Sequence, residues 1–182
     1  MPHAASANRF GIAASSMKKN MGRSRRRLIF RRGKSSCGGT RWRIEVSPSH
    51  LLDTSVYCQP IKPKPLASVQ RRWEKLGDEA LAISIISEGE LLYGLELKQS
   101  QRLTEQYEEL LKDRLRVFPV DGTVARSFAV LKAAARRKGH ACPDFDFLIA
   151  ATARANGLTV ATLNFRHFAG IEGVAVEDWA EE

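Results

Sequence analysis

Residues 143–165 read PDFDFLIAATARANGLTVATLNF, and this stretch decides the fold class. Its first part, 144–157, has the apolar spacing of a helix and ends at a glycine, and an apolar run over 158–163 follows at once. A helix that passes directly into a short buried strand is typical of a parallel sheet covered by helices. The stretch also raises a question of function. Asp144 and Asp146 both stand at the start of the helix, where one carboxylate is enough for a cap.

The same alternation of helix and strand continues on both sides of this stretch. Apolar spacing predicts helices over 65–77, 87–99, 102–114 and 121–139, strands over 80–86, 115–120 and 174–179, and a short apolar run over 50–55 that stops at an aspartate. Strands that alternate with helices form a parallel sheet with helices on both faces. The sequence therefore predicts an α/β fold in one domain over 50–182.

Positive charge is concentrated near the N-terminus. The chain of 182 residues has a formal net charge of +9, but residues 1–50 hold 12 of the 29 Lys and Arg and one of the 20 acids. Residues 51–182 are therefore slightly acidic, with 17 basic and 19 acidic side chains. The basic charge thus does not indicate a basic binding face on the folded domain.

The basic extension over 1–49 is rich in Ser, Arg, Ala and Gly and poor in periodic apolar residues, which predicts disorder. Three interpretations are open: a non-specific nucleic-acid-binding tail, a transit peptide, or a translation start assigned too far upstream. The third is favoured because all three methionines lie in this extension and the first core element begins only at Leu51.

Cysteine usage and hydropathy indicate the compartment. The cysteines at 37, 58 and 142 are odd in number and lack C-x-x-C spacing, which argues against a disulfide framework and against a structural zinc site. No apolar run approaches the length of a membrane span, and no signal-peptide core is present. We expect a cytoplasmic protein with no membrane partner.

Polar residues at the ends of the predicted strands are the candidates for chemistry, because ligands of parallel α/β sheets bind beyond the carboxyl ends of the strands. Four separate segments supply an acid or an amide at such positions: Asp53, Glu90, Asp146 and Asn164.

Each of these residues also has a structural interpretation. Ser87 and Glu90 form an S-x-x-E capping box, and Asp146 could stabilise the first helical turn behind a cap at Asp144. Asn164 is an ordinary turn residue. Asp53 could initiate a turn, but nothing in LLDTSV predicts a helix for it to cap. Its apolar neighbours suggest burial, and a buried carboxylate needs a partner.

A divalent cation would resolve the repulsion between clustered carboxylates. Mg²⁺ takes a few carboxylates together with waters and phosphate oxygens, and it can activate water for attack on a phosphodiester. No competing motif is present: the sequence has no G-x-S-x-G, no G-x-x-x-x-G-K-[ST] and no G-x-G-x-x-G.

Four segments, LLDTS, SIISEGELLYG, PDFDFLIAATARANGLTVATLNFRHF and VAVEDW, occur in an order and spacing that resemble the PIN-domain ribonucleases, and VapC-type toxins of VapBC toxin–antitoxin pairs in particular. The resemblance covers about residues 50–182. It implies an α/β/α sandwich with a central parallel sheet of four to five strands and an acidic pocket for Mg²⁺ or Mn²⁺. It also implies a metal-dependent endoribonuclease, the toxin of a type II system, that acts on single-stranded or tRNA-like RNA.

The resemblance assigns roles residue by residue. Asp53, Glu90 and Asp146 match the metal-binding acids, and Asn164 falls at a fourth position where many members have Asp. An uncharged amide there puts a second metal ion in doubt. Lesser candidates near the ion are Thr54, Ser55, Asp144 and Thr162, and candidate contacts to RNA phosphates are Arg136, Arg137, Arg154 and Arg166, with a solvated helix end as the alternative for each arginine.

Helical geometry separates the paired acids. Residues two apart do not share a helix face, so Asp144 and Asp146 point in different directions, and so do Glu88 and Glu90. We therefore expect Asp144 to cap the helix and Asp146 to bind metal.

The resemblance also implies partners: an RNA substrate, a VapB-like antitoxin whose tail covers the acidic pocket, and a second copy of the chain in a homodimer. One alternative is a catalytically silent PIN domain that binds RNA or a protein, motivated by Asn164 and the basic extension. Another is a phosphatase resembling the haloacid dehalogenases, with Asp53 as nucleophile. This is disfavoured because Ser55 stands where that family has a second Asp.

Overall fold

The structure is a computed structural model that describes residues 28–32 and 42–181. The strands are β1 (Leu28–Arg32), β2 (Trp42–Val46), β3 (His50–Leu52), β4 (Leu81–Ser84), β5 (Arg116–Phe118), β6 (Thr159–Thr162) and β7 (Val176–Asp178). The helices are α2 (Thr54–Tyr57), α3 (Ala67–Leu76), α4 (Ile85–Lys98), α5 (Gln101–Leu110), α6 (Gly122–Arg137), α7 (Asp144–Asn156) and α8 (Phe165–Ala169), with short 3-10 turns at Gln59–Ile61 and Asp78–Ala80.

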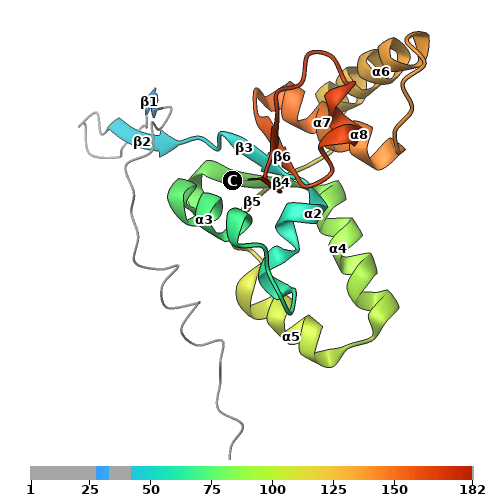
Figure 1. The fold of residues 1–182 in the computed structure, drawn as a ribbon. Coiled ribbons are helices and arrows are strands. Elements are labelled where there is room, and N and C mark those ends of the chain that lie inside the picture. The colour runs from blue at the N-terminus through green and yellow to red at the C-terminus, as the bar shows by residue number, and fades with distance from the viewer. Residues whose placement is uncertain (1–27, 33–41, 182) are drawn as a thin grey trace, which may run out of the picture.

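A parallel sheet of five strands forms the centre of the domain, in the order β5-β4-β3-β6-β7 (Figure 1). The central strand β3 pairs with β4 on one side and with β6 on the other, so that Leu51 lies opposite both Ala82 and Val160. The prediction of an α/β fold with a parallel sheet of four to five strands is confirmed.

The two faces of the sheet carry two separate apolar cores, because successive side chains of a strand point to opposite faces. Leu52, Ile83 and Ala161 belong to the core that α2, α3, α4 and α5 cover. Their neighbours in sequence, at positions 51, 82 and 160, belong to the core under α6, α7 and α8. Figure 1 shows α3 and α5 on one side of the sheet and α6, α7 and α8 on the other, which is the predicted α/β/α sandwich.

Helix α4 begins two residues earlier than predicted, and the strand before it ends at Ser84. Ser84 is the cap, since its hydroxyl accepts a hydrogen bond from the Ser87 amide at 3.0 Å. The hydroxyl of Ser87 donates to the Leu52 carbonyl at 3.2 Å and so joins α4 to the end of β3. The predicted capping box of Ser87 and Glu90 is therefore wrong, and Glu90 has no role at the helix start.

Helix α7 also starts differently from the prediction. Pro143 occupies the cap position without a side-chain hydrogen bond, and Asp144 is the first helical residue. The Asp144 carboxylate instead accepts a hydrogen bond from Lys132 of α6 at 2.5 Å. The predicted cap at Asp144 is thus wrong. The predicted stop is confirmed, because Gly157 ends the helix in the left-handed conformation, with φ 66°.

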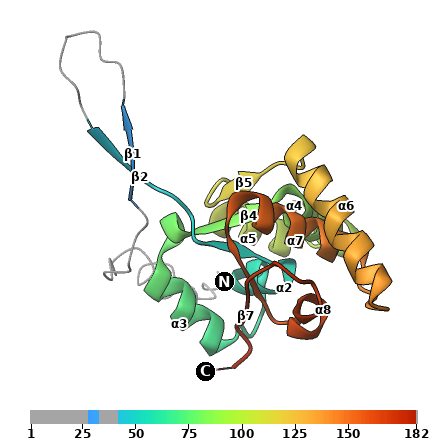
Figure 2. The same cartoon turned by 90° about the horizontal axis from the view of Figure 1, so that it is seen from above.

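Two antiparallel strands lie within the extension that was predicted to be disordered. Strands β1 and β2 pair from Leu28 with Val46 to Arg32 with Trp42, and Figure 2 shows the pair projecting away from the sheet. The missed signal is the strict alternation of apolar and polar residues in WRIEV. The rest of that prediction, over 1–27 and 33–41, lies outside the described residues, and the three interpretations of the extension stay predictions.

Two expectations about the chain as a whole can be compared with the structure. Cys58 and Cys142 are free thiols, as the spacing predicted, while Cys37 lies outside the described ranges. Within those ranges, no helix has the length and apolar character that crossing a bilayer requires.

Candidate active site

Side chains from the ends of two neighbouring strands and from two helices meet at the carboxyl edge of the sheet. Asp53 directly follows β3, Thr162 is the last residue of β6, and Glu90 lies in α4 one turn after Ser87. Because Ser87 is bonded to the end of β3, Glu90 lies close to the segment that carries Asp53. Parallel pairing therefore assembles residues that are up to 109 positions apart.

Asp53 is almost completely buried, with 4% of its surface exposed. One carboxylate oxygen accepts a hydrogen bond from the Thr54 amide at 2.8 Å, and the other accepts from the hydroxyls of Ser55 at 2.6 Å and Thr162 at 2.8 Å. Asp53 also caps α2, a helix of four residues that the sequence analysis did not predict. The expectation that Asp53 has no helix to cap is wrong, while its predicted burial is confirmed.

The two hydroxyls that contact Asp53 are themselves held in place by the backbone. The oxygen of Ser55 accepts a hydrogen bond from the Leu163 amide at 3.0 Å, and that of Thr162 accepts from the Asn164 amide at 2.9 Å. Each hydroxyl therefore directs its own proton at Asp53, and the carboxylate plane is fixed. These donors orient the carboxylate but supply no positive charge.

Glu90 is linked to the same segment through Thr54, whose hydroxyl donates to a Glu90 carboxylate oxygen at 2.5 Å. Burial is the main cause that raises the pKa of Glu90 above its ordinary value. The hydrogen bond from Thr54 opposes the rise, and the negative charges of Asp53 and Asp146 add to it. Glu90 is thus electrostatically coupled to both other acids.

Asp146 reaches the site from the first turn of α7, with 14% of its side chain exposed. Its carboxylate lies 2.8 Å from Nδ1 of His167 in α8. Burial raises the pKa of Asp146 most, the hydrogen bond and charge of His167 lower it, and the charge of Asp53 raises it. The sequence analysis missed His167, which lies 21 positions away in a helix that it did not predict.

The three acids form a cluster whose one basic partner among the described residues is His167, which contacts Asp146. Neither Lys nor Arg pairs with Asp53, Glu90 or Asp146 in the part of the chain that the structure describes. In that same part, no group of three or more His, Cys, Asp or Glu side chains converges closely enough to hold an ion by itself. The donor set suits a hard cation that keeps several waters, as Mg²⁺ does with one or two carboxylates.

The lesser candidates separate into two groups. Thr54, Ser55 and Thr162 contact the acids directly and belong to the site. Asp144 does not, because its carboxylate is 63% exposed and pairs with Lys132. Asn164 contributes its backbone amide to Thr162 and leaves its residue surface exposed to solvent.

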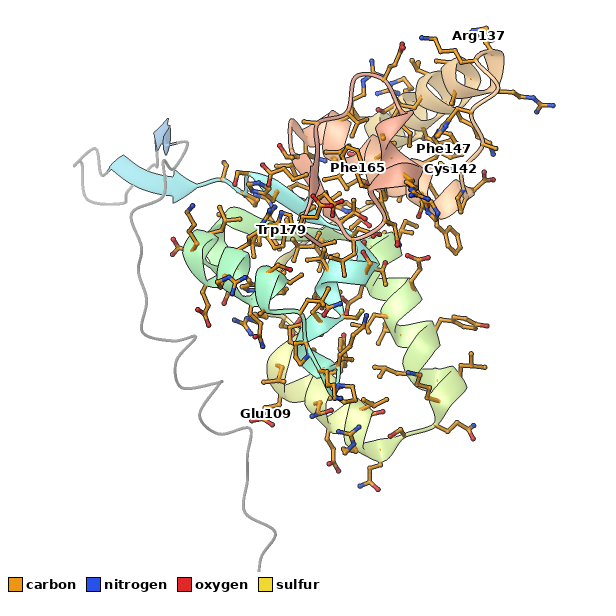
Figure 3. All side chains as sticks on the ribbon, in the orientation of Figure 1. Glu109, Arg137, Cys142, Phe147, Phe165 and Trp179 are labelled. Atoms are coloured by element: carbon orange, nitrogen blue, oxygen red, sulfur yellow. The ribbon has the colours of Figure 1, made fainter. Side chains whose placement is uncertain are left out.

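The candidate arginines differ in their positions relative to the acids. Arg154 lies in the last turn of α7, whose first turn carries Asp146, so it lies away from the edge that carries the acids. Arg136 and Arg137 occupy the last turn of α6, and the chain just beyond them returns to the site edge, where His140 contacts the His167 carbonyl of α8. Figure 3 shows Arg137 at the outer tip of α6. Arg166 lies at the edge of the site in α8, the helix that begins directly after Asn164.

Helix α4 presents other residues away from the site. Glu88 accepts a hydrogen bond from the Tyr107 hydroxyl of α5, which confirms that it points elsewhere than Glu90. Leu95 is part of the core, whereas Leu92 is 41% and Tyr93 69% exposed.

Comparisons with known proteins identify relatives along most of the chain. A family model described as the PIN domain matches residues 50–173. The chain is 34% identical over 130 residues to the tRNA(fMet)-specific endonuclease VapC of Shigella flexneri, which covers 71% of this chain and 97% of that protein. It is similar in structure to DNA-bound VapBC from Salmonella typhimurium, with a TM-score of 0.64, 33% identity and coverage of 72% and 98% of the two chains. A second similar structure is VapBC-5 from Mycobacterium tuberculosis, a member of the VapBC family of toxin–antitoxin systems, with a TM-score of 0.55, 27% identity and the same coverage.

Proposed function

The chain belongs to the PIN domain family, and on this premise we propose that it is a metal-dependent endoribonuclease, the toxin of a toxin–antitoxin pair. The observation that supports this most is the cluster of Asp53, Glu90 and Asp146, which has neither Lys nor Arg as a counter-charge among the described residues. Such a cluster suits a bound cation, and relatives of the chain are named as an endonuclease and a ribonuclease.

Asp53, Asp146 and Glu90 would hold the ion, directly or through water. A bound Mg²⁺ would supply positive charge that polarises the scissile phosphodiester and favours attack by water. Ser55 and Thr162 keep the Asp53 carboxylate in one orientation, and Thr54 does the same for Glu90. One carboxylate oxygen of Glu90 is not bonded to Thr54. Because the pKa of Glu90 is raised, this oxygen is a suitable acceptor for a proton of the attacking water.

Purified protein tests this function directly. We expect labelled RNA to be cut in the presence of Mg²⁺ or Mn²⁺, cleavage to stop with EDTA, and DNA of the same sequence to remain intact. A tRNA is the first substrate to test, because one relative is named a tRNA(fMet)-specific endonuclease. Absence of cleavage, together with absence of Mn²⁺ binding in calorimetry, would instead support a silent binding module.

The proposed partner is a VapB-like antitoxin, since the similar structures include VapBC complexes. Expression of the chain alone in the cytoplasm is expected to arrest growth of the host cell. Co-expression with the antitoxin is expected to relieve the arrest. A homodimer stays a prediction. The exposed side chains of Leu92, Tyr93 and Leu97 on α4 offer one surface for it, which sedimentation of Tyr93→Glu would test.

His167 is expected to support metal binding through Asp146. We expect His167→Ala to weaken Mn²⁺ binding by about 10-fold, because Asp146 loses the donor that orients it and opposes its raised pKa. His167→Asn should retain most of the affinity, since the Asn amide can place a donor near the position of Nδ1. Calorimetric titration of Mn²⁺ without RNA measures the effect. Equal affinity in the wild type and His167→Ala would contradict it.

A further inference from the structure

Two exposed phenylalanines flank the acids of the site. Phe145 is 53% exposed and precedes Asp146, and Phe165 is 40% exposed and follows Asn164. The hydrogen bond between Asp146 and His167 joins the starts of the two helices that carry these rings. Both aromatic residues therefore lie within about two positions of that bond, at the rim of the candidate active site.

The core does not account for these two rings. Phe147 and Phe168, in the same two helices, are 2% and 1% exposed and fill the core. Phe147 packs edge-on against Phe128 of α6 at a centroid distance of 6.5 Å. A single exposed apolar residue needs no explanation, but two aromatic rings beside one cluster of acids point to a ligand.

The charges of the acids at this edge do not favour the binding of RNA. The three acids repel phosphates, and Lys132 already pairs with Asp144. Arg166 lies at this edge in α8, whereas Arg154 lies in the last turn of α7, away from it. Aromatic stacking is a source of affinity close to the acids that does not depend on charge, because every base has a flat π-face.

We propose that Phe145 and Phe165 are stacking platforms for unpaired bases next to the scissile phosphodiester, with Arg166 contacting an adjacent phosphate. This inference rests on the proposed ribonuclease function. It agrees with the single-stranded or tRNA-like RNA that the resemblance implies, since the bases of a duplex are stacked on one another and cannot reach the rings. The preferred RNA is thus a single-stranded loop or end.

Binding of a fluorescent single-stranded RNA in EDTA, where cleavage is blocked, tests the proposal. We expect Phe145→Ala and Phe165→Ala each to weaken binding by about 10-fold, whereas Phe165→Tyr retains it. Leu66→Ala is the matched control, because Leu66 is 42% exposed at the start of α3, on the other face of the sheet and outside the site. Since both phenylalanines are exposed, their removal should leave the fold intact, as circular dichroism would show.

Abasic substitutions in the RNA separate stacking from other causes. If a base stacks on Phe165, removing that base should weaken binding to the wild type but not to Phe165→Ala. If removing a base weakened RNA binding to Phe145→Ala and Phe165→Ala as much as it weakened binding to the wild type, at every position of the RNA, the proposal would be overturned. So would variants that keep RNA affinity and lose only the antitoxin, because the rim would then be a protein-docking surface. Failure of the proposed function is distinguishable, since wild-type protein would then cut no RNA at all.

Discussion

Asp53→Asn is expected to reduce RNA cleavage by roughly 100-fold or more while the protein stays folded. Asp53 is buried and its two oxygens are held by one amide and two hydroxyls, so its negative charge is presented in a fixed position. Asn has the same shape but one acceptor oxygen in place of two, so it cannot accept from both the Thr54 amide and the two hydroxyls. The change therefore removes the charge that would hold the cation and part of the hydrogen bonding, without leaving a cavity.

Comparison with Asp53→Ala makes the interpretation sharper. Alanine would leave the hydroxyls of Ser55 and Thr162 without their acceptor in a buried site, which costs about 1–3 kcal/mol for each unsatisfied group. We expect both variants to lose cleavage, and the Asn variant to lose less stability than the Ala variant because it keeps one acceptor oxygen and the side-chain volume. Thermal unfolding and a cleavage assay on the same samples distinguish the two. An Asn variant that still cuts RNA at the wild-type rate would show that Asp53 is not part of the active site.

The strands and helices were largely predictable because apolar periodicity is a local signal. The run LAIS and the run TVAT are apolar at every core position, and both are strands in the structure. Helix starts were less predictable. Ser84 and Ser87 are both possible caps in sequence, and the choice depends on the Leu52 carbonyl, which engages the hydroxyl of Ser87 from another strand.

The candidate site was predictable to the extent that each residue follows a strand. Asp53 and Glu90 were identified in this way, and the structure places both at the same sheet edge. The hydrogen-bond donors around these acids were less predictable from the sequence, because Thr162 contacts Asp53 only when β6 pairs with β3. His167 lies in α8, a helix of five residues with too few positions to show periodicity.

The arginine predictions depend on topology as well as on charge. Arg154 was chosen by charge, although it ends the helix whose first turn carries Asp146 and so lies away from the acids. Charge in sequence indicates a phosphate contact only when the topology brings that charge to the site. The contacts of Arg136, Arg137 and Arg166 with RNA stay predictions.

Glu90→Gln is expected to lower cleavage by roughly 100-fold and, in the absence of metal, to stabilise the protein. Burial and the charges of Asp53 and Asp146 raise the pKa of Glu90, so its ionised form is unfavourable in the fold. Gln removes that charge and still accepts the Thr54 hydrogen bond. Because Glu90 is partly solvated, we expect a gain of at most about 1 kcal/mol, or about 2–4 °C in Tm near pH 7.

The pH dependence of this difference identifies its cause. A carboxyl whose pKa is raised on folding binds its proton more tightly in the native state, so its contribution stabilises at low pH and is lost as pH rises through the native pKa. In EDTA, the Tm of Glu90→Gln should therefore exceed that of the wild type at pH 7 and approach it near pH 4, where Glu90 is protonated. Added Mg²⁺ should reverse the order at pH 7, because only the wild type has the full set of charges to bind it. If the wild type were more stable than Glu90→Gln in EDTA at neutral pH, the acidic cluster would be stabilised without a cation.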